Sequence, residues 1–202
     1  MTNKKNNETG LNAVTFPNGT NSVLQGTDDA LLHLPEKIVQ FGSGSLFRKL
    51  HNHSIDLALP NEVVNGRVVL VTSNVSTNSD HAISRVLSAK EQWPEILSCS
   101  TNPDLKIIIS NKKLVRKDVL KDNINANPPF SYPGKLLALL FSRYNYFSGD
   151  AEKGLIIISA DKDHNSPETL EAIILELAHL NNLDPLFLDW IENANSFYGR
   201  AV

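Results

Sequence analysis

The chain has 202 residues, a mass of 22.3 kDa and a formal net charge of −3, from 19 Lys and Arg against 22 Asp and Glu. Hydrophobic residues make up 41% and charged residues 20%, which excludes a wholly disordered chain. The single cysteine, Cys99, excludes an intramolecular disulfide and a cysteine-based metal cluster, and no apolar run reaches the ~20 residues that a membrane span needs.

The composition also narrows the cellular setting and the partners. The first ten residues are polar and contain no apolar core of a secretory signal, so we expect a cytoplasmic protein. The isoelectric point near 6.1, and the lack of aromatic residues within the basic stretch 112–121, argue against binding of nucleic acid. We therefore expect neither nucleic acid nor a membrane as a partner.

Residues 1–33 are predicted to form a mobile polar tail. Six asparagines lie within the first 21 residues, and large apolar side chains are scarce there. Such a segment cannot bury enough apolar surface to offset the entropy that it would lose on ordering. Ordered structure is expected to begin at Leu34.

Four runs rich in β-branched residues follow one another along the chain, at residues 37–41, 67–72, 106–110 and 154–159. The second run, Arg-Val-Val-Leu-Val-Thr, is apolar without alternation, as is typical of a parallel strand that is covered on both faces. Turn residues such as Asn65-Gly66 precede these runs. We interpret the four runs as strands of one sheet.

Helical patterns separate and follow these strands. The clearest begins at Ser166, which is followed by Pro167 at the first helical position and by Glu168 in the first turn. Its apolar stripe continues to Leu180. Helices are expected over residues 45–58 and 80–90, from Pro94, over 134–147, from Ser166, and from Asp184 to the C-terminus.

Strands that alternate with helices predict an α/β fold with a doubly wound, mainly parallel sheet and right-handed crossovers. In such a fold, ligands bind beyond the carboxyl ends of the strands. The loops that follow the predicted strands are therefore where we look for a site.

The loop after the first predicted strand carries the most telling motif, Gly-x-Gly-x-x-x-Arg. Gly42 permits a tight turn, and Gly44 removes a Cβ where a phosphate would approach the start of a helix. Arg48 is placed to add a bidentate contact to a phosphate oxygen. The alternative is an ordinary strand-to-helix turn with Arg48 in a surface ion pair. The candidate cofactor contacts in this loop are Gly42, Ser43, Gly44, Ser45, Leu46 and Arg48.

The second strand ends in hydroxyl groups, where an NAD-binding fold usually carries an acid. Thr72 and Ser73 end the strand, and the next acidic residue is Asp80. These hydroxyls either contact a ribose or belong to an ordinary polar loop. Thr72 is therefore a further candidate contact. No arginine lies close by in the sequence to favour a 2′-phosphate, and the choice between NAD and NADP stays open.

Two other groups of polar residues are candidates for a site. Asp161 and His164 follow the last strand and suit either acid–base chemistry or an exposed loop. His51 and His53 are two residues apart, a spacing that would suit metal ligands on a strand, but they fall in a predicted helix. We predict no metal site and assign no catalytic residue.

The segment KIVQFGSGSLFR, residues 37–48, resembles the opening of the mannitol dehydrogenase family of long-chain polyol and hexonate dehydrogenases. Within that family it is most similar to the tagaturonate reductases (altronate oxidoreductases). Further segments match them in order and spacing, at residues 65–71, 83–97, 102–111, 132–158 and 175–195.

The resemblance implies an N-terminal Rossmann domain that binds NAD, followed by a mostly helical domain. It also implies hydride transfer between NADH and a hexuronate ketone during hexuronate catabolism. Gly42, Gly44 and Arg48 carry over as the dinucleotide turn, and Ser110 and Asn111 as the strand end beside the cofactor. The motif Pro133-Gly134-Lys135 also matches the family, without an assigned chemistry.

The sequence departs from the family in four places, one of which is the segment after the last predicted strand, Ser159-Ala160-Asp161 and Ser166-Pro167. A long stretch is missing around residues 73–82, and Lys112-Lys113-Leu114 replaces a Thr-Thr-Glu motif. The helical domain that supplies the catalytic Lys and His in the family does not follow.

We therefore expect residues 34–183 to form an incomplete NAD-binding domain and residues 184–202 to form a junction helix. On this view the protein is truncated and inactive alone, unless a complementing chain supplies the rest. The alternative is a non-catalytic α/β interaction or scaffold protein that has lost cofactor binding.

Overall fold

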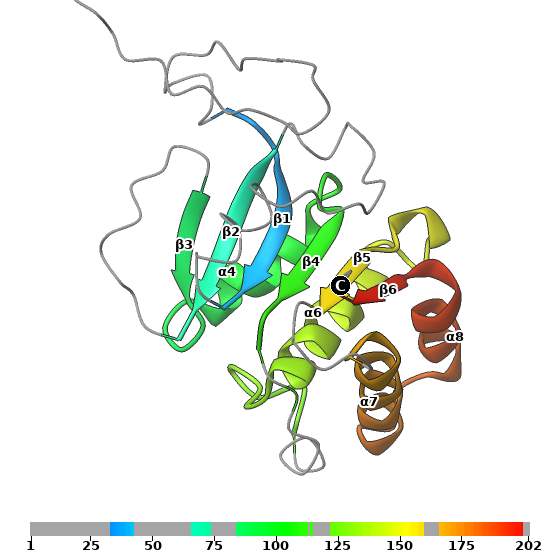
Figure 1. Ribbon diagram of the computed structural model, residues 1–202. Coiled ribbons are helices and arrows are strands. Elements are labelled where there is room, and N and C mark those ends of the chain that lie inside the picture. Colours follow the sequence, from blue (N-terminus) through cyan, green and yellow to red (C-terminus); the bar gives the residue numbers. More distant parts are fainter. Residues whose placement is uncertain are drawn as a thin grey trace, which may run out of the picture.

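The computed structural model describes residues 33–42, 66–73, 84–112, 114, 122–159 and 166–199. Within these ranges, six strands form one parallel sheet in the order β3-β2-β1-β4-β5-β6 (Figure 1). The strands are β1 (Glu36–Phe41), β2 (Arg67–Thr72), β3 (Ser84–Ser88), β4 (Ile107–Ser110), β5 (Ile156–Ser159) and β6 (Ser196–Gly199).

In the described ranges, four helices and two short 3-10 turns accompany the sheet. In Figure 1, α4 and α6 pass behind the strands, and α7 and α8 stand beside the β5–β6 end. The elements are α4 (Trp93–Ser98), η1 (Cys99–Thr101), α6 (Tyr132–Tyr146), η2 (Ala151–Lys153), α7 (Ser166–Leu180) and α8 (Pro185–Ala194).

The strand order 3-2-1-4-5-6 with parallel pairing is that of the Rossmann fold. It confirms the predicted α/β class and its doubly wound sheet. The chain runs outward from β1 to β3 and then returns to the other side of β1 as β4. The carboxyl ends of β1 and β4 therefore form the switch point at which such sheets bind ligands.

Both faces of the central strands are buried. Val39, Val69 and Ile108 pack with the helices in the main hydrophobic core. Their neighbours Val68 and Ile107, on the opposite face, are also buried. The continuous apolar runs in the sequence thus correspond to strands covered on both sides, as predicted.

The helices begin where the sequence places proline and a capping side chain. Pro133 and Pro185 lie at the starts of α6 and α8. Ser131 accepts a hydrogen bond from the Gly134 amide at 3.0 Å, and Asp184 accepts one from the Leu186 amide at 2.9 Å. These caps satisfy backbone donors that the first helical turn leaves unpaired.

Two predicted helical segments are wrong. Residues 84–88, within the helix predicted over 80–90, form the strand β3, whose Val86 pairs with Leu70 of β2. Apolar residues three and four apart fit a helix, but pairing with the sheet determines the conformation of a segment this short. The final helix was predicted to reach the C-terminus; it ends at Ala194, and β6 follows as the sixth strand.

The buried Asn195 explains this change from helix to strand. Its side chain donates to the carbonyls of Trp190 and Ile191 at 3.0 and 3.3 Å, and so ends α8. Its Oδ1 accepts the Leu155 amide at 3.0 Å, just before β5. One amide side chain therefore aligns the end of α8 with the sheet.

Several predictions concern residues that lie outside those the structure describes. They include the polar tail, apart from His33, and the helix predicted over residues 45–58. The division of the chain into units at residues 33 and 183 stays a prediction. Among the helices of the described ranges, none has both the length and the apolar character needed to cross a bilayer.

An ion-pair cluster joins the amino end of β1 to β3 and α4. The guanidinium of Arg85 contacts both carboxylate oxygens of Glu36, at 2.8 and 2.9 Å, and also pairs with Glu95. The buried Cys99 lies beside this cluster, with Sγ 3.8 Å from an Arg85 nitrogen. Burial raises the pKa of the Cys99 thiol to about 11, with Arg85 opposing the shift and both carboxylates adding to it.

We expect folding stability to fall between pH 9 and 11 because of Cys99. The pKa rises on folding from its ordinary 9.0 to about 11, so the native state holds this proton more tightly. The contribution is fully present below pH 9 and is lost as the pH rises through 11, by up to about 3 kcal/mol. Urea unfolding at pH 8, 10 and 11, compared with Cys99→Ala, measures it. Parallel pH profiles of the two proteins would contradict the assignment.

Candidate functional site

Gly42 lies at the switch point, directly after β1. Its amide donates to the Val71 carbonyl of β2 at 3.0 Å, and the Asn111 amide after β4 donates to the Phe41 carbonyl at 3.3 Å. Gly42 has φ +125°, and a Cβ there would lie 1.8 Å from Oδ1 of Asn111. Both the backbone angle and the close approach of Asn111 therefore require glycine.

The structure brings together four of the nine predicted cofactor contacts. Gly42, Thr72, Ser110 and Asn111 lie at the carboxyl ends of the neighbouring strands β1, β2 and β4. Ser110 is buried, and its hydroxyl accepts the Lys112 amide at 3.0 Å. The other five, Ser43, Gly44, Ser45, Leu46 and Arg48, lie outside the described residues and stay predictions.

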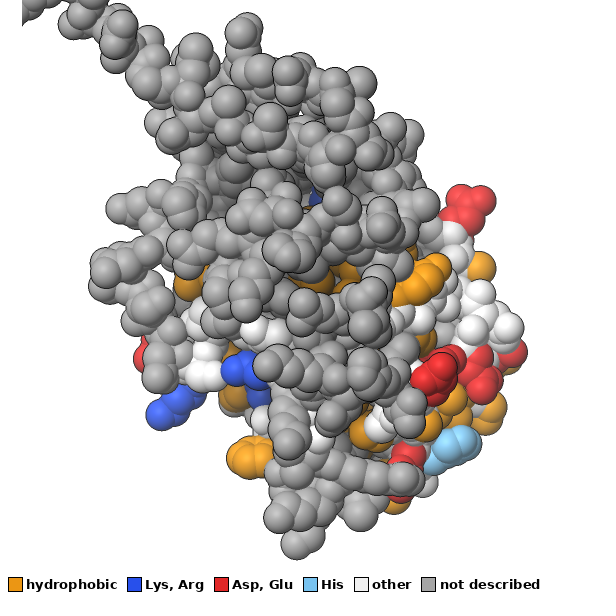
Figure 2. Space-filling model, in the orientation of Figure 1, with side chains coloured by type: hydrophobic (Ala, Val, Ile, Leu, Met, Phe, Trp, Pro, Cys, Tyr) orange, Lys and Arg blue, Asp and Glu red, His pale blue; other side chains and the backbone are white. Residues whose placement is uncertain are grey.

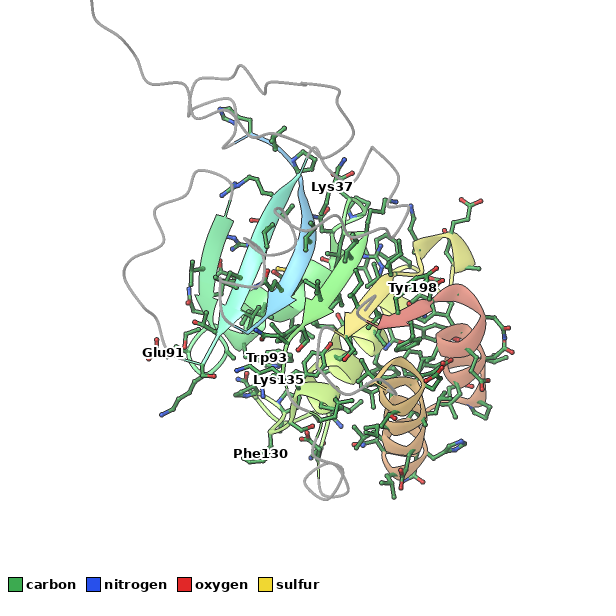
Figure 3. All side chains as sticks on the ribbon, viewed as in Figure 1. Lys37, Glu91, Trp93, Phe130, Lys135 and Tyr198 are labelled. Atoms are coloured by element: carbon green, nitrogen blue, oxygen red, sulfur yellow. The ribbon has the colours of Figure 1, made fainter. Side chains whose placement is uncertain are left out.

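A cleft of about 300 Å³ opens at this edge of the sheet. Phe41, Thr72 and Ser73, at the ends of β1 and β2, form one side of it. Phe130 and Tyr132, at the start of α6, line it as well. Figure 3 shows Phe130 and Lys135 beneath the lower ends of the strands, Phe130 just before α6 and Lys135 within its first turn. The cleft therefore adjoins the Gly42 turn at the ligand-binding edge of the fold.

Three lysines from different parts of the chain line the cleft. Lys90 follows β3, Lys112 follows β4, and Lys135 lies in the first turn of α6. None of the described residues that line the cleft is acidic. In Figure 2, basic side chains appear at the lower left, beside exposed apolar ones. The positive charge suits an anionic ligand such as a phosphate.

Lys135 is held in place by backbone oxygens. Its Nζ donates to the carbonyls of Pro129 and Phe130 at 2.5 and 2.7 Å. Burial lowers its pKa, the nearby Lys112 adds to the shift, and Asp122 opposes it. These contacts make Lys135 a positioned cation at the cleft rather than a mobile surface charge.

The buried Asp122 shapes the loop before α6. Its carboxylate accepts the amides of Phe130 and Ser131 at 2.8 and 2.7 Å, at the positive end of the helix. A Cβ at Gly134 would lie 2.2 Å from Oδ2 of Asp122, so glycine makes room for this carboxylate. The Pro-Gly-Lys motif thus starts the helix, admits Asp122 and places Lys135 at the cleft.

Tyr132 contributes a buried hydroxyl beside the cleft. Its ring centroid is 5.3 Å from that of Phe41. The hydroxyl makes no well-aligned hydrogen bond to any described residue. Burial raises the pKa of Tyr132, and the neighbouring Ser110 side chain opposes the shift. The site therefore places an aromatic ring and a poorly satisfied polar group next to the end of β4.

Sequence reasoning missed Lys90, Phe130, Tyr132 and the role of Lys135. The signal available was the run of prolines before α6, which marks a shaped loop but names no ligand. Asp161 and His164 lie outside the described residues. Within the described ranges, no three His, Cys, Asp or Glu side chains are grouped to hold a metal ion.

The curated proteins that resemble this chain include several altronate oxidoreductases. No family model matches the chain. An altronate oxidoreductase of Cronobacter sakazakii is 29% identical in an alignment that covers 83% of this chain and 41% of the relative. That of Shigella sonnei is 30% identical with the same coverage. The chain thus spans about two fifths of the length of these relatives.

Two solved structures share the fold. The Pseudomonas fluorescens mannitol 2-dehydrogenase, in a ternary complex with NAD and D-mannitol, gives a TM-score of 0.57 at 16% identity. The matched region covers 83% of this chain and 41% of that enzyme. A substrate-free D-sorbitol dehydrogenase gives a TM-score of 0.56 at 18% identity, over 86% of this chain and 43% of the other. Both likenesses agree with the strand order described above.

Proposed function

Because the chain is related to the altronate oxidoreductases of the mannitol dehydrogenase family, we propose that its described residues form the dinucleotide-binding part of an oxidoreductase. The ligand is a nicotinamide adenine dinucleotide, bound across the carboxyl ends of β1, β2 and β4. When bound, its nicotinamide ring gives or accepts a hydride.

The observation that carries this proposal is Gly42 at the switch point of the sheet. Only glycine satisfies both its φ of +125° and the approach of Asn111. This packing fixes the backbone at the end of β1, at the place where Rossmann folds bind a pyrophosphate. A scaffold that had lost its ligand would have no need to keep this turn so tight.

The residues at this edge fit an anionic dinucleotide. Lys90, Lys112 and Lys135 supply positive charge around a cleft lined by Phe41 and Phe130. Aromatic rings offer apolar surface for a flat base, and lysines bind phosphate as point charges. The chain's own part in the reaction is thus to bind and orient the cofactor and to balance its charge.

We extend the proposal to the substrate class because the relatives are named altronate oxidoreductases. The other reactant would be altronate, a hexonate, or the corresponding ketone. Hydride transfer also needs a group that handles the hydroxyl proton, and we assign none in the described residues. The expectations that the chain is inactive alone, and that a complementing chain completes it, stay predictions. An assay with altronate and NAD tests the first.

We expect the purified chain to bind NADH saturably, with a dissociation constant below the millimolar range. The positive cleft and the Gly42 turn supply the phosphate contacts that such binding needs. Titration calorimetry measures the affinity, with adenosine as a control that lacks phosphate. A flat titration at millimolar NADH would remove the dinucleotide role and favour the scaffold alternative.

A further inference from the structure

We propose that Phe130 binds the adenine ring of the dinucleotide, and that the loop before α6 holds the Phe130 side chain at the cleft for this purpose. This assignment rests on the proposed function and gives one part of the ligand to one part of the cleft. It concerns the adenosine half, which NADH shares with ADP-ribose.

The cleft lies on the side of the switch point where a Rossmann fold holds adenosine. Such folds bind one nucleotide half on each half of the sheet, and the end of β2 contacts the adenosine ribose. Thr72 and Ser73, at the end of β2, line this cleft, and so do Ala89 and Lys90 after β3. Among the described residues, none from β5 or β6 lines it. Its volume of about 300 Å³ is at the lower end of small-molecule pockets, which suits one nucleoside rather than a whole dinucleotide.

The backbone of Phe130 is held on both sides. Its amide donates to Oδ1 of Asp122 at 2.8 Å, and its carbonyl accepts a hydrogen bond from Nζ of Lys135 at 2.7 Å. The neighbouring Ser131 amide donates to the other carboxylate oxygen of Asp122 at 2.7 Å. Pro129 precedes Phe130 and has a restricted φ. The point from which the Phe130 side chain leaves the loop is therefore well determined.

The side chain of Phe130, by contrast, is open to solvent. It is 79% exposed, more than any other large apolar side chain that the structure describes, and it lines the cleft. In Figure 3 it lies below the carboxyl ends of the strands, clear of the ribbon. A single exposed apolar residue is common on a protein surface, but here the exposed ring is combined with a fixed backbone at a cleft. A ring held in this way loses little conformational entropy when a flat ligand packs against it.

Adenine is the part of the dinucleotide that suits this ring. It is a flat, uncharged aromatic base, and such bases stack on aromatic side chains. The phosphates suit the lysines instead: Nζ of Lys112, which follows β4, lies 3.3 Å from the hydroxyl oxygen of Ser73 after β2, on either side of β1. Nicotinamide is the other flat ring of the ligand, but it belongs to the half of the sheet formed by β4, β5 and β6. Phosphates beside Lys112 and a base on Phe130 therefore place the adenosine half along the cleft.

The test measures the binding of NADH and of ADP-ribose to the full chain by calorimetry. ADP-ribose contains the adenosine and both phosphates but no nicotinamide. We expect Phe130→Ala to weaken the binding of both ligands about tenfold, and Phe130→Trp to keep both within about twofold, because the larger ring retains the stacking surface. Tyr146→Ala is the matched control, since Tyr146 is 63% exposed but lies at the opposite end of α6 from the cleft. Circular dichroism checks that each variant is folded.

A second measurement reports the contact itself. The fluorescence of the introduced indole in Phe130→Trp should fall when ADP-ribose binds, because a base stacked on the indole quenches its emission. The emission of Tyr146→Trp should stay unchanged. The chain's own tryptophans, Trp93 and Trp190, are buried, and the unchanged protein gives their background signal. A merely structural role of Phe130 would not produce this quenching.

The outcomes separate this assignment from the proposed function. Undiminished binding of both ligands by Phe130→Ala overturns the assignment and leaves the proposed function standing, and the exposed ring would then serve another contact, such as one with a protein. Loss of NADH affinity with ADP-ribose binding unchanged also overturns it, since the ring would then hold nicotinamide. Weaker binding by Phe130→Ala without quenching in Phe130→Trp overturns it too, because the effect would not come from stacking. If the unchanged protein binds neither ligand, both proposals fail.

Discussion

Replacing Gly42 by alanine is expected to reduce dinucleotide affinity at least a hundredfold and to lower the free energy of unfolding by about 3 kcal/mol. The added Cβ would lie 1.8 Å from Oδ1 of Asn111, and the φ of +125° disfavours any side chain. The turn must therefore move, and Asn111 with it. Calorimetry with NADH and urea unfolding measure the two effects.

The chain offers a matched control for this glycine. A Cβ at Gly66, at the amino end of β2, would lie 2.8 Å from Cγ and Cδ and 2.9 Å from Cβ of Lys37. Gly66→Ala should therefore lower stability, because Lys37 must shift, but leave binding intact, because Gly66 lies at the opposite end of the strand from the cleft. Adding Asn111→Ala to Gly42→Ala removes the clash but keeps the strained φ, so stability should recover only in part. Normal binding by folded Gly42→Ala would contradict the proposed site.

The sequence was sufficient to predict the elements whose signals are local. The apolar runs of β1, β2, β4 and β5 need burial on both faces, and the structure confirms them. The strands β3 (SRVLS) and β6 (SFYG) escaped prediction because they lack the continuous β-branched runs of the equally short β4 and β5, and owe their conformation to pairing with β2 and β5. Periodicity over so few residues does not separate a strand from a helix.

The candidate site likewise contains residues that a local pattern predicts and contacts that only the fold creates. The role of Gly42 was predictable because a glycine directly after the first strand allows the tight turn that a Rossmann fold makes there, and this pattern is visible in the sequence. The approach of Lys112 to Ser73 depends on strand order, which brings the ends of β4 and β2 to one edge. The position of Phe130 depends on Asp122, which holds the Phe130 amide. Contacts set by topology cannot be derived from local patterns.

Arg143 is expected to be the most costly side chain to remove from the core. It is 1% exposed, and burial lowers its pKa to about 10, so its charge persists at neutral pH. The guanidinium donates to the carbonyls of Ser100, Asn102 and Leu105 at 2.8, 2.9 and 3.3 Å, and to that of Lys153 at 2.5 Å. It thereby joins α6 to η1, to the loop before β4 and to η2.

Arg143→Met should lower the free energy of unfolding by about 3 to 5 kcal/mol, because four carbonyls lose a charged donor that water cannot easily replace. Arg143→Lys keeps the charge but has three donors and no planar fork, so it should recover only part of the loss. Asn145→Ala, at an exposed position of the same helix, should change stability by about 0.5 kcal/mol or less. Urea unfolding at pH 7 measures all three, and a loss below 1 kcal/mol in Arg143→Met would show that the carbonyls find other partners.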